Sequence, residues 1–327
     1  MTPDVSIIVV NWNTCELTLA CLRSVYAETR EVSFELLVVD NASGDGSADA
    51  IAEAFPQVVL LRQTENLGFA RANNVAAARA RGEFLLLLNS DTVVFDQAID
   101  RLVAFARAHP DAGIYGGRTF FEDGTLNPSS CWARSTPWSE YCHAVGLSRV
   151  FRRSGLFNPE SFGSWQRDTV RQVDIVSGCF FLIRRALWER LGGFSPDFFM
   201  YGEEADLCLR AARIGARPLV CPDAQIIHYG GRSERTPAGK LVKLLDARRR
   251  LIERHWPGFW VGFGRTMQKL GVLQRLVFAR LARLCGHKAS ADRAKIFAEV
   301  WRRRREWATP DDDHPANRPA SAGAAHE

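Results

Sequence analysis

The stretch Val5-Ser6-Ile7-Ile8-Val9-Val10, followed by Asn11-Trp12-Asn13, decides the fold. Most of its first six residues are β-branched and apolar, which is typical of a strand buried on both faces of a sheet. Strands of this kind occur in parallel sheets whose faces are covered by helices. The polar residues that follow therefore lie at the carboxyl end of the strand, where such sheets bind ligands.

The residues after this strand repeat the pattern of an apolar strand, a polar turn and a helix. Strands and helices alternate over residues 34–39, 48–54, 58–61, 70–81 and 84–88. Short connections between them predict an α/β fold with a mostly parallel central sheet and flanking helices. Polar clusters follow three of the strands, at 11–13, 40–41 and 89–92. We expect these clusters to meet at one edge of the sheet.

The later part of the chain is less regular. We expect loops over 118–170, a strand-like run over 173–183, a helix over 203–213, two short strands within 217–228 and basic helices over 240–306. Within these helices one apolar stripe is predicted, made of Leu273, Leu276, Val277, Leu281 and Leu284.

The composition is that of a globular protein. Of the 327 residues, 46% are hydrophobic and 24% are charged, which excludes a largely disordered or fibrous chain. Eight cysteines are scattered without CxxC pairs, so free thiols in a reducing cytosol are expected, and neither disulfides nor a zinc site. The chain has no run of 18 apolar residues and no basic region before its first apolar stretch. We therefore expect no membrane span and no signal peptide.

Charge is distributed unevenly along the chain. Residues 240–306 contain 18 Lys and Arg but 5 Asp and Glu, whereas the whole chain has a net charge of +5. We divide the chain into an α/β domain (1–235), a basic amphipathic helical extension (236–308) and a disordered tail (309–327) without core-forming residues. The basic extension indicates an anionic surface as partner. No nucleic-acid-binding module accompanies the charge, so nucleic acid is not expected.

Two predicted strands end in carboxylates. Asp91 lies just after the apolar strand in the run Leu86-Leu87-Leu88-Asn89-Ser90-Asp91-Thr92. At the tip of this strand a divalent cation and a diphosphate can both reach its carboxylate. Asp40, which follows Val38-Val39, can accept hydrogen bonds from a nucleobase or a ribose hydroxyl. Each pattern is also explained without function, by a helix cap at Asp91 and by an Asx turn at Asp40.

The segment 65–74 has features of an anion site. Gly68 permits a close backbone approach, and the N-terminus of the next helix favours negative charge. Arg71 adds a positive charge where a pyrophosphate would lie. A helix cap with a solvated arginine explains the same residues.

A second acidic cluster begins a helix further along the chain. Glu203, Glu204 and Asp206 are followed by Arg210. Crowded carboxylates beside aromatic residues can raise a pKa and produce a general base. The helix dipole and an ion pair between Asp206 and Arg210 explain the same pattern structurally. His228 ends an apolar strand and is either a metal or phosphate ligand or a hydrogen-bonded core residue.

Taken in order, these segments resemble the family 2 inverting glycosyltransferases with the GT-A fold. The likeness is greatest to the bacterial rhamnosyltransferase-like branch that builds surface polysaccharides, and it covers roughly residues 4–235. The segments that carry it are 5–13, 39–43, 66–74, 88–92, 177–185, 201–208 and His228. By contrast, Val9 to Asn13 contains no glycine, which excludes the GxGxxG turn of a nicotinamide oxidoreductase.

The resemblance implies ligands for the nucleotide and for a metal ion. The residues implied for the nucleotide are Asn11, Asp40, Arg71 and Asn74. Asp91 corresponds to the second carboxylate of the family's Asp-x-Asp metal motif, in which Asn89 takes the first place. Together with His228 it would hold Mg²⁺ or Mn²⁺.

The resemblance also implies a general base and a pocket. The family's acidic motif usually reads Glu-Asp and here reads Glu203-Glu204, so Glu204 takes the place of the base. Asp206 is the second candidate for that role. Ser177, Gly178 and Glu203 would shape the pocket for the donor sugar and the acceptor.

The implied reaction is a single displacement at the anomeric carbon of a nucleotide-activated sugar, with inversion. The expected donor is dTDP-rhamnose, and the expected acceptor is a hydroxyl of a glycan or polyprenyl-linked saccharide in cell-surface polysaccharide synthesis. Such an enzyme would be cytoplasmic and peripheral, at the inner face of the cytoplasmic membrane. A non-catalytic nucleotide-sugar or glycan-binding protein of the same fold is the alternative, and a homo-oligomer is left open.

Overall fold

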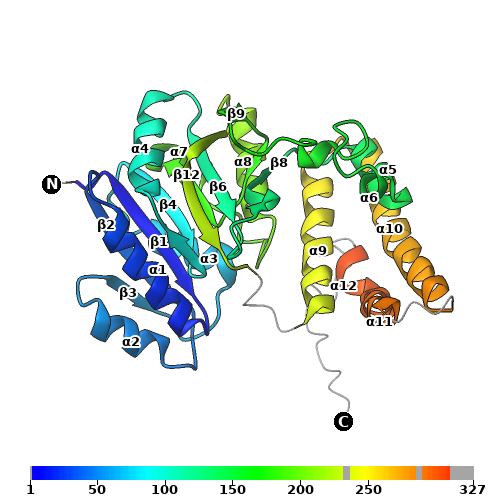
Figure 1. The fold of residues 1–327 in the computed structure, drawn as a ribbon, viewed down its shortest axis with the longest axis horizontal. Coiled ribbons are helices and arrows are strands. Elements are labelled where there is room, and N and C mark those ends of the chain that lie inside the picture. Colours follow the sequence, from blue (N-terminus) through cyan, green and yellow to red (C-terminus); the bar gives the residue numbers. More distant parts are fainter. Residues whose placement is uncertain (1, 231–235, 285–288, 310–327) are drawn as a thin grey trace, which may run out of the picture. The chain divides into compact units, whose positions relative to one another are not determined.

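The computed structural model describes residues 2–230, 236–284 and 289–309 (Figure 1). The tail predicted for 309–327 lies outside the described residues from residue 310 onward. None of the helices in the described part of the chain is long and apolar enough to cross a membrane.

The chain divides into two compact units. The first is built from residues 1–134 and 151–233, and the second from residues 135–150 and 234–327. The sequence pattern places 135–150 in the α/β domain. The structure instead packs this segment with the C-terminal helices, because its helix α5 lies against α10. That pairing is remote in sequence, so no local pattern could indicate it.

The first unit contains the sheet and its flanking helices (Figure 1). Its helices are α1 (Cys15–Glu28), α2 (Ser47–Ala54), α3 (Gly68–Ala77), α4 (Ala98–Ala108), α7 (Arg185–Leu191) and α8 (Glu203–Arg213), with short 3₁₀ turns η1 (Pro128–Ser130) and η2 (Pro159–Ser161). Its longer strands are β1 (Val5–Asn11), β2 (Phe34–Asp40), β3 (Val59–Arg62), β4 (Phe84–Asn89), β6 (Ile114–Phe120), β11 (Phe180–Arg184) and β12 (Leu219–His228). Its shorter strands are β5 (Thr92–Val94), β7 (Leu126–Asn127), β8 (Cys131–Trp132), β9 (Arg171–Gln172) and β10 (Ile175–Val176).

The strands form one large sheet with the order β3-β2-β1-β4-β11-β6-β12-β5. The four strands predicted from the first hundred residues, β3, β2, β1 and β4, are parallel, as expected. β11 is antiparallel to both β4 and β6, whereas β12 is parallel to β6. The predicted α/β architecture is therefore confirmed, with antiparallel strands inserted in its second half.

The core forms around β1 and β4, which are neighbouring strands in the middle of this sheet. Val5, Ile7 and Val9 of β1 are fully buried and pack in one cluster with residues of α1, α2 and α4. The side chains between them, such as Ile8, are equally buried, because both faces of the sheet are covered. This rigid centre fixes the positions of the polar residues at the strand ends.

Two boundaries differ from those predicted. The region 217–228 is one strand, β12, with a bulge between Cys221 and Gln225, and not two short strands. The apolar run expected over 173–183 is divided between β10, which pairs with β8, and β11. The turn Ser177-Gly178-Cys179 between them carries part of the candidate site.

The second unit is helical. It consists of α5 (Pro137–Val145), α6 (Leu147–Val150), α9 (Pro237–His255), α10 (Gly258–Leu284), α11 (Ala289–Arg302) and α12 (Arg304–Ala308). Its core joins Val242, Val272 and Val300 from three helices with Trp307, which is fully buried. The predicted basic helices are thus packed against one another, and the segment 135–150 belongs with them.

Candidate active site

Asn11, the last residue of β1, is the centre of a buried hydrogen-bond network at the carboxyl edge of the sheet. Its Nδ2 donates to Oδ1 of Asp40 at 2.8 Å, and its Oδ1 accepts from Oγ1 of Thr18 at 2.7 Å. Oγ1 of Thr14 donates to the same Asn11 oxygen and lies 3.1 Å from Oγ of Ser90. Because Asn11 is completely buried and both its amide atoms are engaged, its hydrogen bond orients the Asp40 carboxylate.

Asp40 lies beside Asn11 in the register of the parallel strands β1 and β2. Its Oδ2 accepts a hydrogen bond from the backbone N–H of Ser43 at 3.2 Å. The residue is 3% exposed and lies at the carboxyl end of β2. A carboxylate offers about four acceptor positions, which leaves Asp40 able to accept further hydrogen bonds.

The close backbone approach expected at Gly68 is present, but a different group makes it. Gly68 has a φ of +77°, and a Cβ there would lie 2.3 Å from the carbonyl oxygen of Phe199. That oxygen accepts from the backbone N–H of Phe69 at 2.8 Å, and the N–H of Gly68 donates to Asn66. The first N–H groups of α3 are therefore used by the chain itself, which weakens the case for a phosphate at this helix end.

The two nucleotide residues expected on α3 differ in their surroundings. Arg71 is exposed on the first turn of the helix, where its charge faces solvent. Asn74 instead forms two hydrogen bonds with the backbone of Phe194, one as donor at 2.8 Å and one as acceptor at 3.0 Å. Asn74 thus connects α3 to the segment after α7, and we leave it out of the nucleotide-binding set.

Asp91 and His228 come together from opposite ends of the sequence. Asp91 follows β4, and His228 is the last residue of β12, which pairs with β5 directly after Asp91. Nε2 of His228 lies 3.2 Å from Oδ1 of Asp91 and 3.3 Å from Nδ2 of Asn89. A backbone hydrogen bond of 3.0 Å from Tyr229 to the carbonyl of Asp91 fixes this arrangement.

The electrostatics of this pair favour an ionised carboxylate. Burial raises the pKa of Asp91, but the hydrogen bond and the charge of His228 outweigh it, and the pKa is lowered. Burial lowers the pKa of His228, whereas Cys179 and Asp91 raise it, with a net increase to about 10. Within the described residues no group of three or more His, Cys, Asp or Glu side chains is placed to hold a metal ion.

The turn Ser177-Gly178-Cys179 connects this pair to the acidic cluster. The carbonyl of Cys179 accepts a hydrogen bond from the backbone N–H of Asn89 at 3.1 Å. On the other side, a Cβ on Gly178 would lie 3.9 Å from the Cβ of Glu204. Ser177 holds the turn through a bond of its backbone N–H to the carbonyl of Ser130. The turn therefore lies between the Asp91–His228 pair and Glu204.

Glu203 and Glu204 are the first two residues of α8. One oxygen of each, Oε2, is buried and has no hydrogen-bond partner. Burial raises the pKa of Glu204. Burial and the charge of Glu204 raise the pKa of Glu203 well above its usual range. Glu203 is 3% exposed, while Glu204 is only half-buried, so Glu204 is the one that a substrate can reach.

Asp206 has a structural environment. It is fully buried, and its Oδ2 accepts from Nε of Arg210 at 2.8 Å. Arg210 also donates to the backbone carbonyls of Leu191 and Gly193 at 2.6 and 2.7 Å. The Asp206–Arg210 pair thus ties α8 to the end of α7, which corresponds to the structural alternative considered for this pattern.

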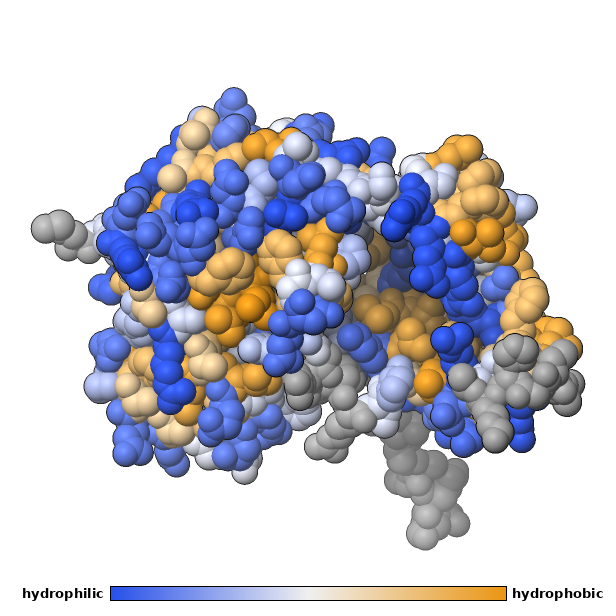
Figure 2. Space-filling model, in the orientation of Figure 1, coloured by the Kyte–Doolittle hydropathy of each residue, from blue (hydrophilic) through white to orange (hydrophobic). Residues whose placement is uncertain are grey.

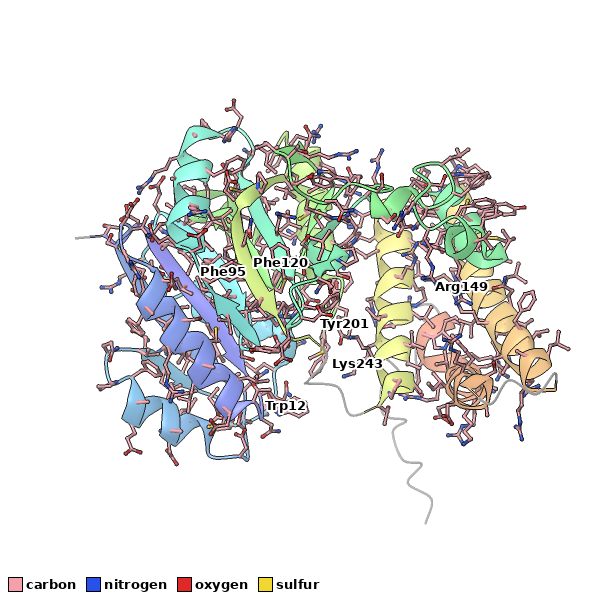
Figure 3. The ribbon with its side chains drawn as sticks, viewed as in Figure 1. Trp12, Phe95, Phe120, Arg149, Tyr201 and Lys243 are labelled. Carbon is pink, nitrogen blue, oxygen red and sulfur yellow. The ribbon has the colours of Figure 1, made fainter. Side chains whose placement is uncertain are left out.

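Tyr201, which belongs to the segment 201–208 named above, has a backbone conformation that the sequence analysis did not predict. Its φ is +72°, and Gly202 after it has a φ of +88°. Left-handed backbone costs about 1–2 kcal/mol in a non-glycine residue, so the surrounding structure must hold this conformation. Tyr201 precedes α8, and Trp12 follows β1; both lie at the same end of the first unit (Figure 3). A Tyr-Gly pair before acidic residues is the only sequence signal for this turn.

This fold, with its strand-end carboxylates, is that of the GT-A glycosyltransferases. Residues 6–192 match the model of glycosyl transferase family 2, which is more than half of the chain. The chain belongs to this family. The match ends before Glu204 and His228.

Two characterised relatives carry names from cell-surface glycan synthesis. O-antigen biosynthesis protein RfbC of Myxococcus xanthus is 31% identical over 243 residues, which is 72% of this chain but 18% of the relative. The N-acetylglucosaminyl-diphospho-decaprenol L-rhamnosyltransferase of Mycobacterium tuberculosis (strain ATCC 25618 / H37Rv) is 31% identical over 231 residues, 66% of this chain and 73% of the relative. The chain thus spans less than a fifth of RfbC and almost three quarters of the rhamnosyltransferase.

A solved structure shares the fold over nearly the whole chain. The mannosyltransferase PcManGT from Pyrobaculum calidifontis, in complex with GDP-Man and Mn²⁺, has a TM-score of 0.58 and 19% identity. The alignment covers 95% of this chain and 89% of that one. This similarity supports the GT-A architecture.

Proposed function

We propose that the chain is an inverting glycosyltransferase that transfers a sugar from a nucleoside-diphosphate donor to a hydroxyl of a glycan or lipid-linked saccharide. One observation carries the proposal. The Asp91–His228 pair and Glu204, which come from three distant segments, flank the turn at Gly178. This arrangement supports a charge site for the leaving group and a carboxylate for the acceptor on two sides of one turn.

The nucleotide belongs at the ends of β1 and β2. Asp40, oriented by Asn11, accepts hydrogen bonds from the base or ribose, and exposed Arg71 interacts with the diphosphate. A guanidinium in such a position stabilises the charge that develops as the diphosphate leaves. The role of Asn11 in this proposal is to hold Asp40 in place.

The donor set at Asp91 fits Mg²⁺ or Mn²⁺. The Asp91 carboxylate offers an oxygen ligand, which both ions accept, and His228, 3.2 Å away, would offer a nitrogen ligand once the bound ion displaces the proton from its Nε2. Mg²⁺ in such enzymes is typically held by one or two carboxylates, with phosphate oxygens and water completing its shell. When bound, the cation supplies positive charge to the departing diphosphate.

Glu204 serves as the general base. Its raised pKa brings the carboxyl closer to the operating pH, where a base is most effective. Glu204 removes the proton from the acceptor hydroxyl as that oxygen attacks the anomeric carbon, and the configuration inverts. Ser177, Gly178 and Glu203 line the space around it. We do not assign the role of base to Asp206, because its carboxylate is paired with Arg210.

The donor sugar and the acceptor are proposed from the name of one relative. L-rhamnose from dTDP-rhamnose is the proposed donor, and a polyprenyl-diphosphate saccharide is the proposed acceptor, because one relative is named for that chemistry. An acceptor of this kind lies on a membrane, so we propose that the protein works at the inner face of the cytoplasmic membrane. Its product would enter cell-surface polysaccharide synthesis.

The test is binding followed by turnover. Calorimetry with dTDP, UDP and GDP, each with Mg²⁺, Mn²⁺ or EDTA, is expected to show metal-dependent binding of dTDP. Release of dTDP from dTDP-rhamnose is then expected to depend on a polyprenyl-diphosphate N-acetylglucosamine acceptor. A folded protein that binds dTDP-rhamnose yet leaves it intact with every acceptor would favour the non-catalytic alternative.

A further inference from the structure

Helix α10 is apolar on two opposite faces. Its inner face, with Val272, Leu276 and Ala279, is buried against other helices of the second unit. Large apolar side chains also lie exposed along its outer side, namely Phe259, Leu270, Leu273, Val277 and Leu281. Spacings of three, four and eleven residues put the second set on one line along the helix. Within the stripe predicted from sequence, Leu276 is buried, whereas Leu273, Val277 and Leu281 are exposed.

The exposed apolar line continues on α5 and α6. α5 packs against α10 within the second unit, and its exposed side chains include Trp138 and Tyr141, whose rings stack with centroids 5.6 Å apart. Val150 of α6 is 73% exposed and Phe259 of α10 is 79% exposed. We call this set the outer apolar face: Trp138, Tyr141, Val145, Val150, Phe259, Leu270, Leu273, Val277 and Leu281. Figure 2 shows hydrophobic side chains gathered over α5, α6 and α10.

Basic residues accompany this face. α10 contains five Lys and Arg and no Asp or Glu. Lys269, Arg280 and Arg283 are exposed on the same helix. A helix that offers apolar side chains to one side and lysines and arginines beside them fits the headgroup region of an anionic bilayer. Trp138 and Tyr141 also suit that region, since their rings have an apolar body and a polar tip.

A second copy of the chain fits this face less well. In a two-fold contact along α10 the basic residues of both copies would meet without an acidic partner on that helix. Like charges at such short range disfavour the contact. Charge complementarity therefore selects an anionic surface.

We propose that the outer apolar face docks on an anionic phospholipid bilayer, with Val277, Leu281 and Phe259 entering the boundary between headgroups and acyl chains. The positive charges of Lys269, Arg280 and Arg283 then lie at headgroup level. The choice of a bilayer agrees with the lipid-linked acceptor of the proposed function. Docking itself needs neither sugar donor nor turnover, so it can be tested separately.

The test is co-sedimentation of the full chain with vesicles of phosphatidylcholine alone or with added phosphatidylglycerol. The double variant Val277→Glu/Leu281→Glu is expected to bind the anionic vesicles more than about tenfold more weakly than the parent, because two apolar contacts are replaced by charges. Lys269→Gln/Arg280→Gln is expected to weaken binding by roughly fivefold for each charge removed. The matched control is Leu244→Glu, which places the same charge at an exposed leucine of α9.

Several outcomes would overturn the proposal. Unchanged vesicle binding by Val277→Glu/Leu281→Glu, with circular dichroism like the parent's, would exclude the outer apolar face as the docking surface. Equal binding to neutral and anionic vesicles would show that the basic residues of α10 do not contribute to docking. A parent dimer that the double variant dissociates, seen by sedimentation velocity, would make a second copy the occupant. Loss of nucleotide binding with intact vesicle binding would count against the proposed function alone.

Discussion

Gly178 and Glu204 face each other at a separation that leaves room for one additional methyl group. A Cβ on Gly178 would lie 3.9 Å from the Cβ of Glu204 and 3.4 Å from the ring of Phe69. Both distances are ordinary van der Waals contacts, and the φ of Gly178 is outside the left-handed region. A glycine is therefore not needed here for the backbone, but a side chain larger than a methyl group would press against Phe69 and Glu204.

Filling that space is expected to impair transfer more than folding. Gly178→Val adds a branched side chain between Phe69 and Glu204, so the acceptor should be displaced from the carboxylate. We expect kcat/KM to fall roughly 100-fold, as displacements near 1 Å can produce. Thermal unfolding should change far less. Gly155→Val, at a glycine with no atom within 4 Å of the added Cβ, is the control and should keep full activity.

Neutralising the two neighbouring glutamates should have unequal effects on the rate. Glu204→Gln removes the proposed base and is expected to lower kcat by about 10²–10⁴-fold, with little change in nucleotide binding. Glu203→Gln should cost less than about tenfold, since burial and the charge of Glu204 already raise the pKa of Glu203. In the parent, the acidic limb of the rate profile should lie above pH 4.5, because burial raises the pKa of Glu204. Equal losses in both variants would contradict the assignment.

The buried Glu203 also gives a stability prediction. Its pKa is raised in the folded state, so the folded protein binds the proton more tightly than the unfolded chain. The contribution to stability is present below the ordinary value of 4.5 and is lost as pH rises toward the folded pKa. Glu203→Gln should therefore raise Tm at pH 7.5, by roughly 2–4 °C for each kcal/mol gained, and have little effect near pH 4. A gain at both pH values would exclude ionisation as its cause.

The Asp91–His228 pair predicts a loss of metal-dependent activity on neutralisation. Asp91→Asn keeps the shape of the side chain but removes its charge, and we expect kcat to fall at least about 100-fold. Addition of Mn²⁺ or Mg²⁺ should then no longer tighten dTDP binding in calorimetry. Asp96→Asn, at an exposed carboxylate paired with Arg101, is the control and should behave as the parent. A variant that still responds to metal would show that the ligands lie elsewhere.

Asp206 should matter for stability and little for catalysis. Asp206→Ala leaves Arg210 without its buried carboxylate, and we expect a loss of roughly 3 kcal/mol in urea unfolding. The activity per folded molecule should stay within about tenfold of the parent, because Asp206 removes no proton in the proposed mechanism. Glu189→Ala, which breaks the exposed pair with Arg185, is expected to cost at most about 1 kcal/mol. A stable but inactive Asp206→Ala variant would restore Asp206 as the base.

Local sequence predicted those parts of the fold whose causes are local. The β-branched run that starts at Val5 and the strand-helix alternation after it correctly predicted the parallel half of the sheet, in which Asn11 and Asp40 lie side by side at the strand ends. Helix α8 was expected over 203–213 and has those bounds, because its acidic start and apolar spacing are contained in one segment.

What depends on distant partners could not be predicted. The antiparallel insertion of β11 and the association of residues 135–150 with the C-terminal helices are set by packing. Asn74 was expected at the nucleotide, yet its amide atoms bind the backbone of Phe194, 120 residues away. Leu273 and Leu276 are three residues apart on α10, yet Leu273 is exposed and Leu276 is buried, because the helices that pack beside α10 decide which apolar side chains are covered.

The position of β12 also bears on how the chain reaches this structure during synthesis. β12 pairs with β6 and β5, and it brings His228 to Asp91 across more than a hundred residues of sequence. Contacts of such long range form late, and a growing chain folds its N-terminal part first. We therefore expect a ribosome-bound chain that stops near residue 200 to have folded the proposed nucleotide end of the site. In that chain Asp91 has not yet formed its contact with His228, because β12 has not been synthesised.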